Sequence, residues 1–412
     1  MKKFAIIFYN TSTNEPTISF IPTKTSESCY KTQITNNTIN ISFMYNNKKY
    51  RLLYFLLYPI LWIIQIIFSV ILHIRHLLYD AKILKSYRFD NIYTICIGNL
   101  NLGGTGKTPL TNYLIHLLKP HYKIAVLSRG YGRKTKGFRI VQINDNYTIC
   151  GDEPLMYKLN HPDAIVAVCE DRVQGIKELQ KLYPDIQILI LDDAFQHRKI
   201  QAHTNILLTT YHCPFPKDQL FPLGNLRDLK NRSQYADIIV ISKTPENIDE
   251  KIQEKFLKNF PLTPDKIYFS SIEYDDFYAL HYPQTIKPHK ELSNYNCILV
   301  TGIANPEPLA LFIKEYARHF YHLAFPDHHG FSEKDIQLIK SVYQEWQQHH
   351  PPAIIITTEK DIMRLKPYTT TYFNLPIFVA PIKISFQNSS NTFNQKILNY
   401  VRTNLSNKPL HT

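Results

Sequence analysis

The stretch NLNLGGTGKTPLTNYL at residues 99–114 constrains the fold of this 412-residue chain more than any other. The apolar run YTICIG precedes it, and the helix-forming pattern PLTNYLIHLL follows its GKT sequence. A strand, a glycine-rich turn and a helix in this order form a P-loop, whose backbone N–H groups surround phosphate oxygens. The stretch therefore predicts an α/β fold with a parallel sheet of the P-loop NTPase type.

The residue types in this loop indicate how a nucleotide would be held. The glycines have no Cβ that would keep phosphate oxygens away from the backbone. We expect Lys107 to reach the β- and γ-phosphates of ATP, and the hydroxyl of Thr108 to bind Mg²⁺. Asn101 stands where the usual pattern has glycine. The predicted nucleotide contacts are Gly103, Gly104, Thr105, Gly106, Lys107 and Thr108.

Two acidic segments are candidates for metal binding and proton transfer. The apolar run in ILILDDAFQH ends at Asp192 and Asp193, where carboxylates hold Mg²⁺ opposite a P-loop. The sequence CGDEP places Asp152 and Glu153 at a predicted helix start. One of these two carboxylates can accept a proton from an attacking hydroxyl while the other helps to hold metal. The alternative is an acidic helix N-terminus that is stabilised by the helix dipole alone.

A third candidate is the histidine-rich segment FPDHHGFSEKD at residues 325–335. It contains no cysteine and no H-E-x-x-H spacing, so zinc is not favoured. A histidine beside a carboxylate suits general-base support. The segment LSRGYGRK adds Arg129, Tyr131 and Arg133 as candidates for contacts with phosphate or substrate, unless they are simply solvated.

Residues 52–74 contain no Asp, Glu, Lys or Arg. A helix over most of this run is about 31 Å long, close to the thickness of a bilayer core. A small-residue cleavage site is missing, which argues against a secretory signal. We expect a membrane-associated helix within 44–85, either spanning the bilayer or lying in its interface, with a buried soluble helix as the alternative.

The formal net charge of +13 fits either an anionic partner (a membrane surface, a phosphorylated substrate or a nucleic acid) or simply a solvated basic surface. The sequence has no helix-turn-helix, zinc-finger or RNP-like signature, so we expect no nucleic-acid partner. The runs from residue 90 onward alternate between strand and helix patterns and form two series. The predicted division is a weakly ordered extension at 1–43 (or sequence upstream of a true start at Met44), the apolar helix at 44–85, a P-loop domain at 86–285 and a smaller α/β lobe at 286–412. The predicted strands are residues 92–98, 123–128, 164–169, 186–193, 204–210, 236–242, 297–303, 353–358 and 377–384.

The motifs together resemble tetraacyldisaccharide 4′-kinase, the lipid A 4′-kinase family of Gram-negative bacteria. The resemblance runs from about residue 50 to near residue 400 and rests on GNLNLGGTGKTP, SRGYG, GDEP, AVCEDR, DDAFQH, FPLGNLRD, TGIANPEP, FPDHHGFS and TTEKD in this order. It implies transfer of the γ-phosphate of ATP to the 4′-hydroxyl of a tetraacylated glucosamine disaccharide 1-phosphate at the cytoplasmic face of the inner membrane. The implied partners are this glycolipid and an anionic membrane surface, with no obligate protein partner.

The resemblance also implies roles for individual residues. Asp152 matches the proposed base, which acts with a histidine of the DHH motif, here His328. Arg227 of NLRD matches a basic residue near the phosphates. Positions tied to Mg²⁺ and ATP are matched by Glu153, Asp192 and Asp193. The alternative function is a membrane-tethered P-loop NTPase that acts as a switch or chaperone, which has no need of an acceptor-side base.

Overall fold

The structure, a computed structural model, describes residues 4–9, 16–21, 51–246, 248–280, 285–372, 375–387 and 390–406. The chain divides into two compact units. The first, which we call the P-loop unit, comprises Met44–Glu273 and Lys383–Thr412. The second unit comprises Met1–Phe43 and Tyr274–Ile382.

The P-loop unit is built on a nine-stranded sheet in the order β17-β10-β9-β8-β3-β7-β4-β6-β5. The six strands from β9 to β6 in this order run parallel, as does β10 beside β9. Their residues form near-continuous apolar runs because both faces of the sheet are covered. The strands are β3 (Tyr93–Asn99), β4 (Ile124–Ser128), β5 (Arg139–Ile140), β6 (Ile165–Val168), β7 (Ile188–Asp192), β8 (Thr204–Thr210), β9 (Ile238–Ser242), β10 (Ile267–Tyr274) and β17 (Ile382–Phe386).

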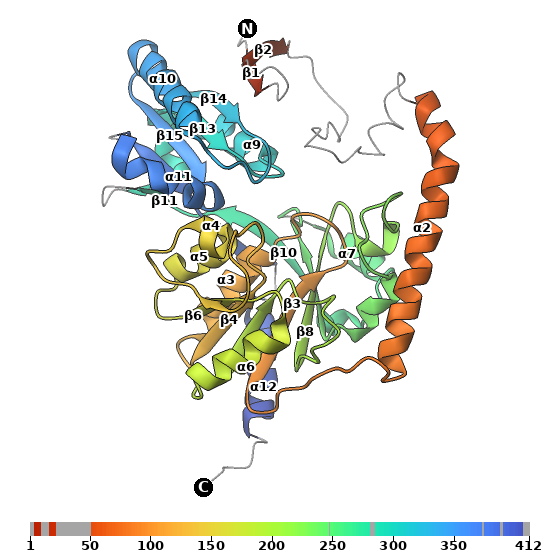
Figure 1. Cartoon of the computed structure of the whole chain (residues 1–412). Helices are drawn as coiled ribbons and strands as arrows, with labels where there is room; N and C mark the ends of the chain where they lie inside the picture. The colour runs from red at the N-terminus through yellow and green to blue at the C-terminus, as the bar shows by residue number, and fades with distance from the viewer. Residues whose placement is uncertain are drawn as a thin grey trace. The chain divides into compact units, whose positions relative to one another are not determined.

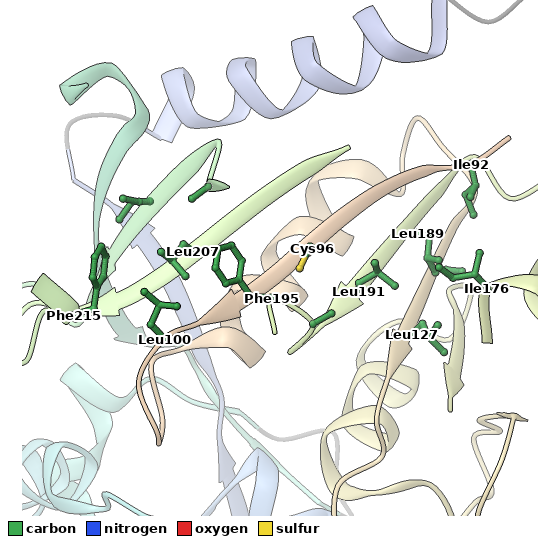
Figure 2. Packing of buried hydrophobic residues seen from close by; sticks show 14 of the residues in the cluster. Ile92, Cys96, Leu100, Leu127, Ile176, Leu189, Leu191, Phe195, Leu207 and Phe215 are labelled. Atoms are coloured by element: carbon green, nitrogen blue, oxygen red, sulfur yellow. The ribbon is translucent and has the colours of Figure 1, made fainter. Parts of the chain in front are cut away.

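Helices complete this unit, and side chains such as Leu127, Phe195 and Phe215 pack along the sheet to form its core (Figure 2). The parallel α/β sheet predicted from the sequence is confirmed. The helices are α2 (Arg51–Asp80), α3 (Lys107–Leu118), α4 (Tyr147–Cys150), α5 (Asp152–Asn160), α6 (Arg172–Leu182), α7 (Glu250–Leu257) and α12 (Ser390–Ser406), and most are labelled in Figure 1.

The second unit has an eight-stranded sheet in the order β12-β11-β16-β15-β13-β14-β1-β2. Its strands are β1 (Phe4–Tyr9), β2 (Pro16–Ile21), β11 (Phe277–Ala279), β12 (Thr285–Ile286), β13 (Asn296–Thr301), β14 (His319–Ala324), β15 (Ala353–Thr358) and β16 (Ile377–Ala380). Its helices are α8 (Pro288–Glu291), α9 (Glu307–Tyr316), α10 (Glu333–His349) and α11 (Glu359–Tyr372). Strands β1 and β2 fall within the predicted extension at 1–43; the rest of that extension lies outside the described residues.

The C-terminal segment differs from the predicted division of the chain. Residues 377–384 were expected to form one strand of the second lobe, but they form β16 and the start of β17, which belong to different sheets. Pro381 lies between these strands and has no N–H to donate to a ladder. After it the chain stays with the P-loop unit, where Phe393 of α12 stacks on Phe386 with ring centroids 4.1 Å apart. Tyr113 of α3 also donates a hydrogen bond to Asn394 Oδ1 at 2.7 Å.

Helix α2 is the feature that most distinguishes this unit from a plain nucleotide-binding domain (Figure 1). The segment Leu57–Asp80 is long and apolar enough to cross a membrane, and only 6% of its most apolar part is buried. Its C-terminal end is fixed to the unit, because Arg75 donates to the carbonyl of Gln196 at 2.7 Å and His76 Nε2 lies 2.6 Å from Asp228 Oδ1. The low burial of this apolar helix does not fit the buried soluble helix that was the alternative.

Candidate active site

The glycine-rich loop leads from β3 into α3 and leaves open space beside its backbone. Gly103 and Gly106 have φ angles of 98° and 86°, which side-chain-bearing residues rarely adopt. A Cβ added at Gly103 or Gly104 would meet no atom within 4 Å. Thr105 is buried, and its carbonyl accepts a 2.7 Å hydrogen bond from Ser242 at the end of β9. The loop is thus anchored at one residue and open at the glycines, as a phosphate site requires.

Two polar contacts bring the predicted loop residues to the acidic segments. Lys107 Nζ donates to Asn99 Oδ1 at 3.3 Å and lies 3.7 Å from Asp193 Oδ1. Thr108 Oγ1 donates to Glu153 Oε1 at 3.2 Å. The structure therefore brings the P-loop, the GDEP segment and the DDAFQH segment together at the carboxyl end of the sheet.

Arg227 joins the same group of side chains. Its guanidinium donates to both carboxylate oxygens of Asp193 and to Asn99 Oδ1. Burial would raise the pKa of Asp193, but the charges of Lys107 and Arg227 outweigh it and hold this pKa below the usual range. Asp193 also has a φ of 48°, a strained conformation for a residue with a side chain. Two cations and one carboxylate are thus held within reach of the glycine-rich loop.

Asp192 is in the opposite electrostatic situation. Its carboxylate is buried and accepts hydrogen bonds from Ser128 Oγ and Tyr157 OH, both at 3.2 Å. Burial, together with the charges of Glu153 and Asp193, raises its pKa to about 7. A cation placed between these carboxylates would reduce their mutual repulsion and the free-energy cost of burying the Asp192 charge.

The donor set fits Mg²⁺, which prefers oxygen ligands and is usually held by one or two carboxylates together with substrate phosphates. Thr108, Glu153 and Asp192 offer hydroxyl and carboxylate oxygens on neighbouring segments. Among the described residues, no group of three or more His, Cys, Asp or Glu forms a metal cage. These residues therefore suit a metal that arrives with a nucleotide.

Asp152 is the first residue of α5 and is buried, with Oδ1 accepting a hydrogen bond from the N–H of Glu153 at 2.9 Å. Its loop packs backbone to backbone against the SRGYG loop. A Cβ on Gly130 would lie 2.8 Å from the carbonyl oxygen of Cys150, and a Cβ on Gly151 would lie 3.1 Å from the carbonyl oxygen of Tyr131. The glycines of the two motifs thus hold Asp152 in place.

The DHH segment belongs to the second unit, and its two histidines differ. His328 is partly exposed, has a φ of 56° and donates its backbone N–H to the carbonyl of Gly302 at 3.0 Å. His329 lies between Phe325 and Phe331, and its Nε2 is 3.0 Å from Asp335 Oδ2. His329 therefore has a structural role, whereas His328 is presented at the surface of its unit in a strained conformation.

The TTEKD segment supports this histidine loop from within the second unit. Arg364 is buried and donates to the carbonyls of His329 and Gly302, both at 3.2 Å, and to Asp361 Oδ1 at 2.9 Å. Asp361 in turn accepts a hydrogen bond from Thr358 Oγ1 at 2.8 Å. One guanidinium therefore ties together the TGIAN, DHH and TTEKD motifs.

Sequence reasoning missed several polar residues at these sites. Asn99, Ser128 and Tyr157 contact the predicted carboxylates or lysine. Asn99 and Ser128 belong to the GNLNLGGTGKTP and SRGYG motifs but were not singled out there, and Tyr157 lies inside a helix, where nothing marks it. Arg364 follows Asp361 at the i, i+3 spacing of a helical ion pair, and this spacing was the available signal.

Comparison with known proteins agrees with this geometry. The sequence profile of the tetraacyldisaccharide-1-P 4′-kinase family matches residues 57–402. A tetraacyldisaccharide 4′-kinase of Bacteroides thetaiotaomicron is 39% identical over 85% of this chain and 94% of its own length. The enzyme of the same name from Flavobacterium psychrophilum is 40% identical over 83% and 96%. A crystal structure of LpxK from Aquifex aeolicus in complex with ATP is 26% identical, with a TM-score of 0.63, over 83% of this chain and 99% of that one.

Proposed function

The chain belongs to the tetraacyldisaccharide-1-P 4′-kinase family, and from this premise we propose roles for individual residues in its reaction. The enzyme transfers the γ-phosphate of ATP to the 4′-hydroxyl of tetraacyldisaccharide 1-phosphate in lipid A biosynthesis. This family assignment decides against a membrane-tethered switch or chaperone ATPase.

The first proposal concerns the nucleotide. The backbone of the glycine-rich loop and the ammonium group of Lys107 bind the phosphates, and Arg227 neutralises charge that develops during transfer. Thr108, Glu153, Asp192 and Asp193 are the residues that would hold Mg²⁺, which shields the phosphate oxygens when it is bound. The pairing of Lys107 and Arg227 with Asp193 supports this proposal, because it keeps both cations oriented before the nucleotide arrives.

The second proposal concerns the acceptor. Asp152 takes the proton of the 4′-hydroxyl as this oxygen bonds to the γ-phosphorus and the bond to ADP breaks. The observation that supports this role is the 3.2 Å hydrogen bond from Thr108 to Glu153. Glu153 directly follows Asp152 in the chain, so the segment that carries Asp152 contacts the P-loop. His328 assists Asp152 by stabilising the negative charge that develops on the 4′-oxygen as its proton moves to the Asp152 carboxylate. The exposed imidazole and strained backbone of His328 support this role.

The third proposal concerns location. The enzyme acts at the cytoplasmic face of the inner membrane, with α2 in the lipid and the basic surface against anionic headgroups. The acyl chains of its substrate and the net charge of +13 support this assignment. We expect neither a nucleic-acid partner nor an obligate protein partner.

A double-mutant cycle tests whether Asp152 and His328 act as one unit. We expect Asp152→Asn to lower kcat by about 10³-fold and His328→Ala by about 10²-fold. If both residues serve one proton transfer, the double variant is little slower than Asp152→Asn alone. Phosphate transfer from radiolabelled ATP to the lipid gives the rates, and binding of a fluorescent ATP analogue verifies that the nucleotide site is intact.

Multiplicative losses in this cycle would show that His328 acts independently of Asp152. A wild-type rate in Asp152→Asn would rule out the base role altogether. His329→Ala is the matched control for His328, because the two rings are adjacent in sequence but only His329 is packed between aromatic rings.

A further inference from the structure

A cavity of about 360 Å³ lies in the P-loop unit beside the C-terminal end of α2. Its walls come from the end of α2, the segment 194–202 that follows Asp192 and Asp193, and the short helix η2 (Lys230–Tyr235). It is separate from the nucleotide site, since Lys107, Asp193 and Arg227 do not line it. Pockets of this size accommodate small organic ligands and headgroups.

The charged side chains around this cavity are mostly cations. Lys82, Arg198 and Arg232 line it together with one carboxylate, Asp80. Arg198 already holds that carboxylate through Nη2 and donates Nη1 to the carbonyl of His76 at 2.8 Å. The acidic group is therefore used, and the cavity keeps an excess of positive charge.

Arg232 is the residue that points to a ligand. Its relative exposure is 7%, and its Nε and Nη1 atoms are buried without a hydrogen-bond partner. Its guanidinium lies 3.9 Å from the centre of the Tyr235 ring, in the arrangement of a cation–π contact. The nearby carboxylate of Asp228 makes no hydrogen bond to it: Asp228 Oδ1 accepts from His76 Nε2 and from the N–H of Leu229, and Asp228 Oδ2 is buried without a hydrogen-bond partner. The charge of Asp228 offsets part of the cost of burying this guanidinium, and an anion in the cavity that reaches Arg232 would offset more of it.

The position of the cavity narrows the class of anion. Arg75 and His76 are the first basic residues after the apolar run of α2, and both are fixed to the unit next to the cavity. Whether α2 spans the membrane or lies in it, residues just past its apolar run lie at headgroup level. Phosphate is the anion that lipids present at this level, and arginine donors fit it well.

We propose that this cavity, through Arg198 and Arg232, binds the phosphate group of a membrane lipid. The phosphate belongs either to the 1-position of the acceptor disaccharide or to the headgroup of an anionic phospholipid. In both cases the site orients the enzyme on its lipid without touching the reacting atoms, so Arg232 is a positioning residue. The inference rests on the kinase activity and is independent of the roles proposed for Asp152 and His328.

Two measurements on the full-length protein distinguish the two sources. Kinetics in neutral-detergent micelles compare the 1-phosphorylated acceptor with the same disaccharide lacking the 1-phosphate. Flotation compares phosphatidylcholine vesicles with and without phosphatidylglycerol. The variant is Arg232→Gln, and the matched control is Lys230→Gln, which removes an equal charge from an exposed side chain of the same short helix.

If the site binds the substrate phosphate, Arg232→Gln raises KM about tenfold for the phosphorylated acceptor only, with kcat unchanged. If it binds phospholipid, Arg232→Gln loses the phosphatidylglycerol-dependent part of vesicle binding. Lys230→Gln behaves like wild type in both measurements. Ala202→Phe, which fills the cavity and keeps every cation, gives the same losses as Arg232→Gln and covers the case in which that variant folds poorly.

Wild-type KM and wild-type vesicle binding in folded Arg232→Gln would overturn the inference. A fall in kcat at unchanged KM would also contradict it, because that result assigns the arginine to catalysis.

Discussion

At the P-loop, Lys107, Arg227 and Asp193 pair with one another and stay partly exposed, whereas the Arg364–Asp361 pair that supports the His328 loop is buried. The side chains of Lys107, Arg227 and Asp193 are 17%, 26% and 36% exposed. Those of Arg364 and Asp361 are 2% and 0% exposed. All of these residues except Arg364 lie in the sequence motifs quoted above.

This difference separates residues that bind ligands from residues that build the site. A partly exposed ion pair in water contributes little to stability, so its members can exchange partners for phosphate at small cost. A buried pair cannot be opened in this way, because the remaining charge would stay unpaired in a poorly solvating interior. Motif residues of the first kind should affect the reaction, and those of the second kind should affect folding.

The largest expected effect is the loss of transfer in Lys107→Ala. Removal of this cation takes away phosphate binding and charge stabilisation, so kcat/KM should fall by about 10³-fold or more. The free energy of unfolding should change by less than about 1 kcal/mol, because Asp193 keeps its contact with Arg227. Lipid phosphorylation and urea unfolding measure the two quantities, with the exposed Lys119→Ala as control. A large loss of stability in Lys107→Ala would break the comparison.

The next largest effect should come from Arg364→Met and should appear in stability. This change leaves Asp361 buried without its cation and frees the carbonyls of Gly302 and His329. We expect the free energy of unfolding to fall by about 3–5 kcal/mol. Trp346 of α10 reports unfolding of the second unit in a Trp62→Phe background.

The exposed Arg318→Met, in the same unit, is the control for this experiment. Unchanged unfolding together with a large loss of kcat would contradict the assignment of Arg364 to the scaffold.

The fold was predictable where strands are buried on both faces. The segments around β3, β7 and β9 carry continuous apolar runs, and the structure has strands there. Strand β14 was missed because its sequence HFYHLA is mostly half-buried and shows no such run. Strand β10 was missed because it lies in a stretch that looked like a polar interruption. The fate of residues 377–384 depends on which sheet each half joins, and local sequence does not encode that.

The sites were predictable to a different extent. Glycine and acidic motifs mark the P-loop segments by spacing alone, and the structure brings these segments together. Two adjacent histidines cannot be ranked from sequence, because the difference between them comes from Phe325 and Phe331 packing around only one ring. Arg232 carries no motif signal, and only its burial in the folded chain reveals its unused donors.

The paired variants His328→Ala and His329→Ala sharpen the comparison within a single motif. We expect His328→Ala to lower kcat about 10²-fold and to change stability by less than about 0.5 kcal/mol. His329→Ala should lower the free energy of unfolding by about 1–3 kcal/mol, because Asp335 loses a partner and an aromatic stack is removed. Kinetics and urea unfolding of both variants provide the measurement. Equal kinetic losses with equal stability would show that the two rings are not functionally distinct.

Asp192 gives the smallest effect and the strictest comparison, because it is buried like Asp361 but lies in the P-loop unit. Burial raises the pKa of both carboxyl groups, and Arg364 counteracts this shift at Asp361. With a pKa of about 7, Asp192 is mostly protonated at pH 6 and mostly ionised at pH 8. A bound Mg²⁺ requires the carboxylate, so binding of magnesium with ADP should release up to about one proton from Asp192 at pH 6 and almost none at pH 8. Calorimetry in buffers of different ionisation enthalpy measures this release. The proton release measured with Asp192→Asn gives the contribution of the nucleotide itself, which is subtracted from the wild-type value. Equal proton release by wild type and Asp192→Asn at pH 6 would mean that Asp192 is already ionised there, and that a partner inside the protein satisfies it as Arg364 satisfies Asp361.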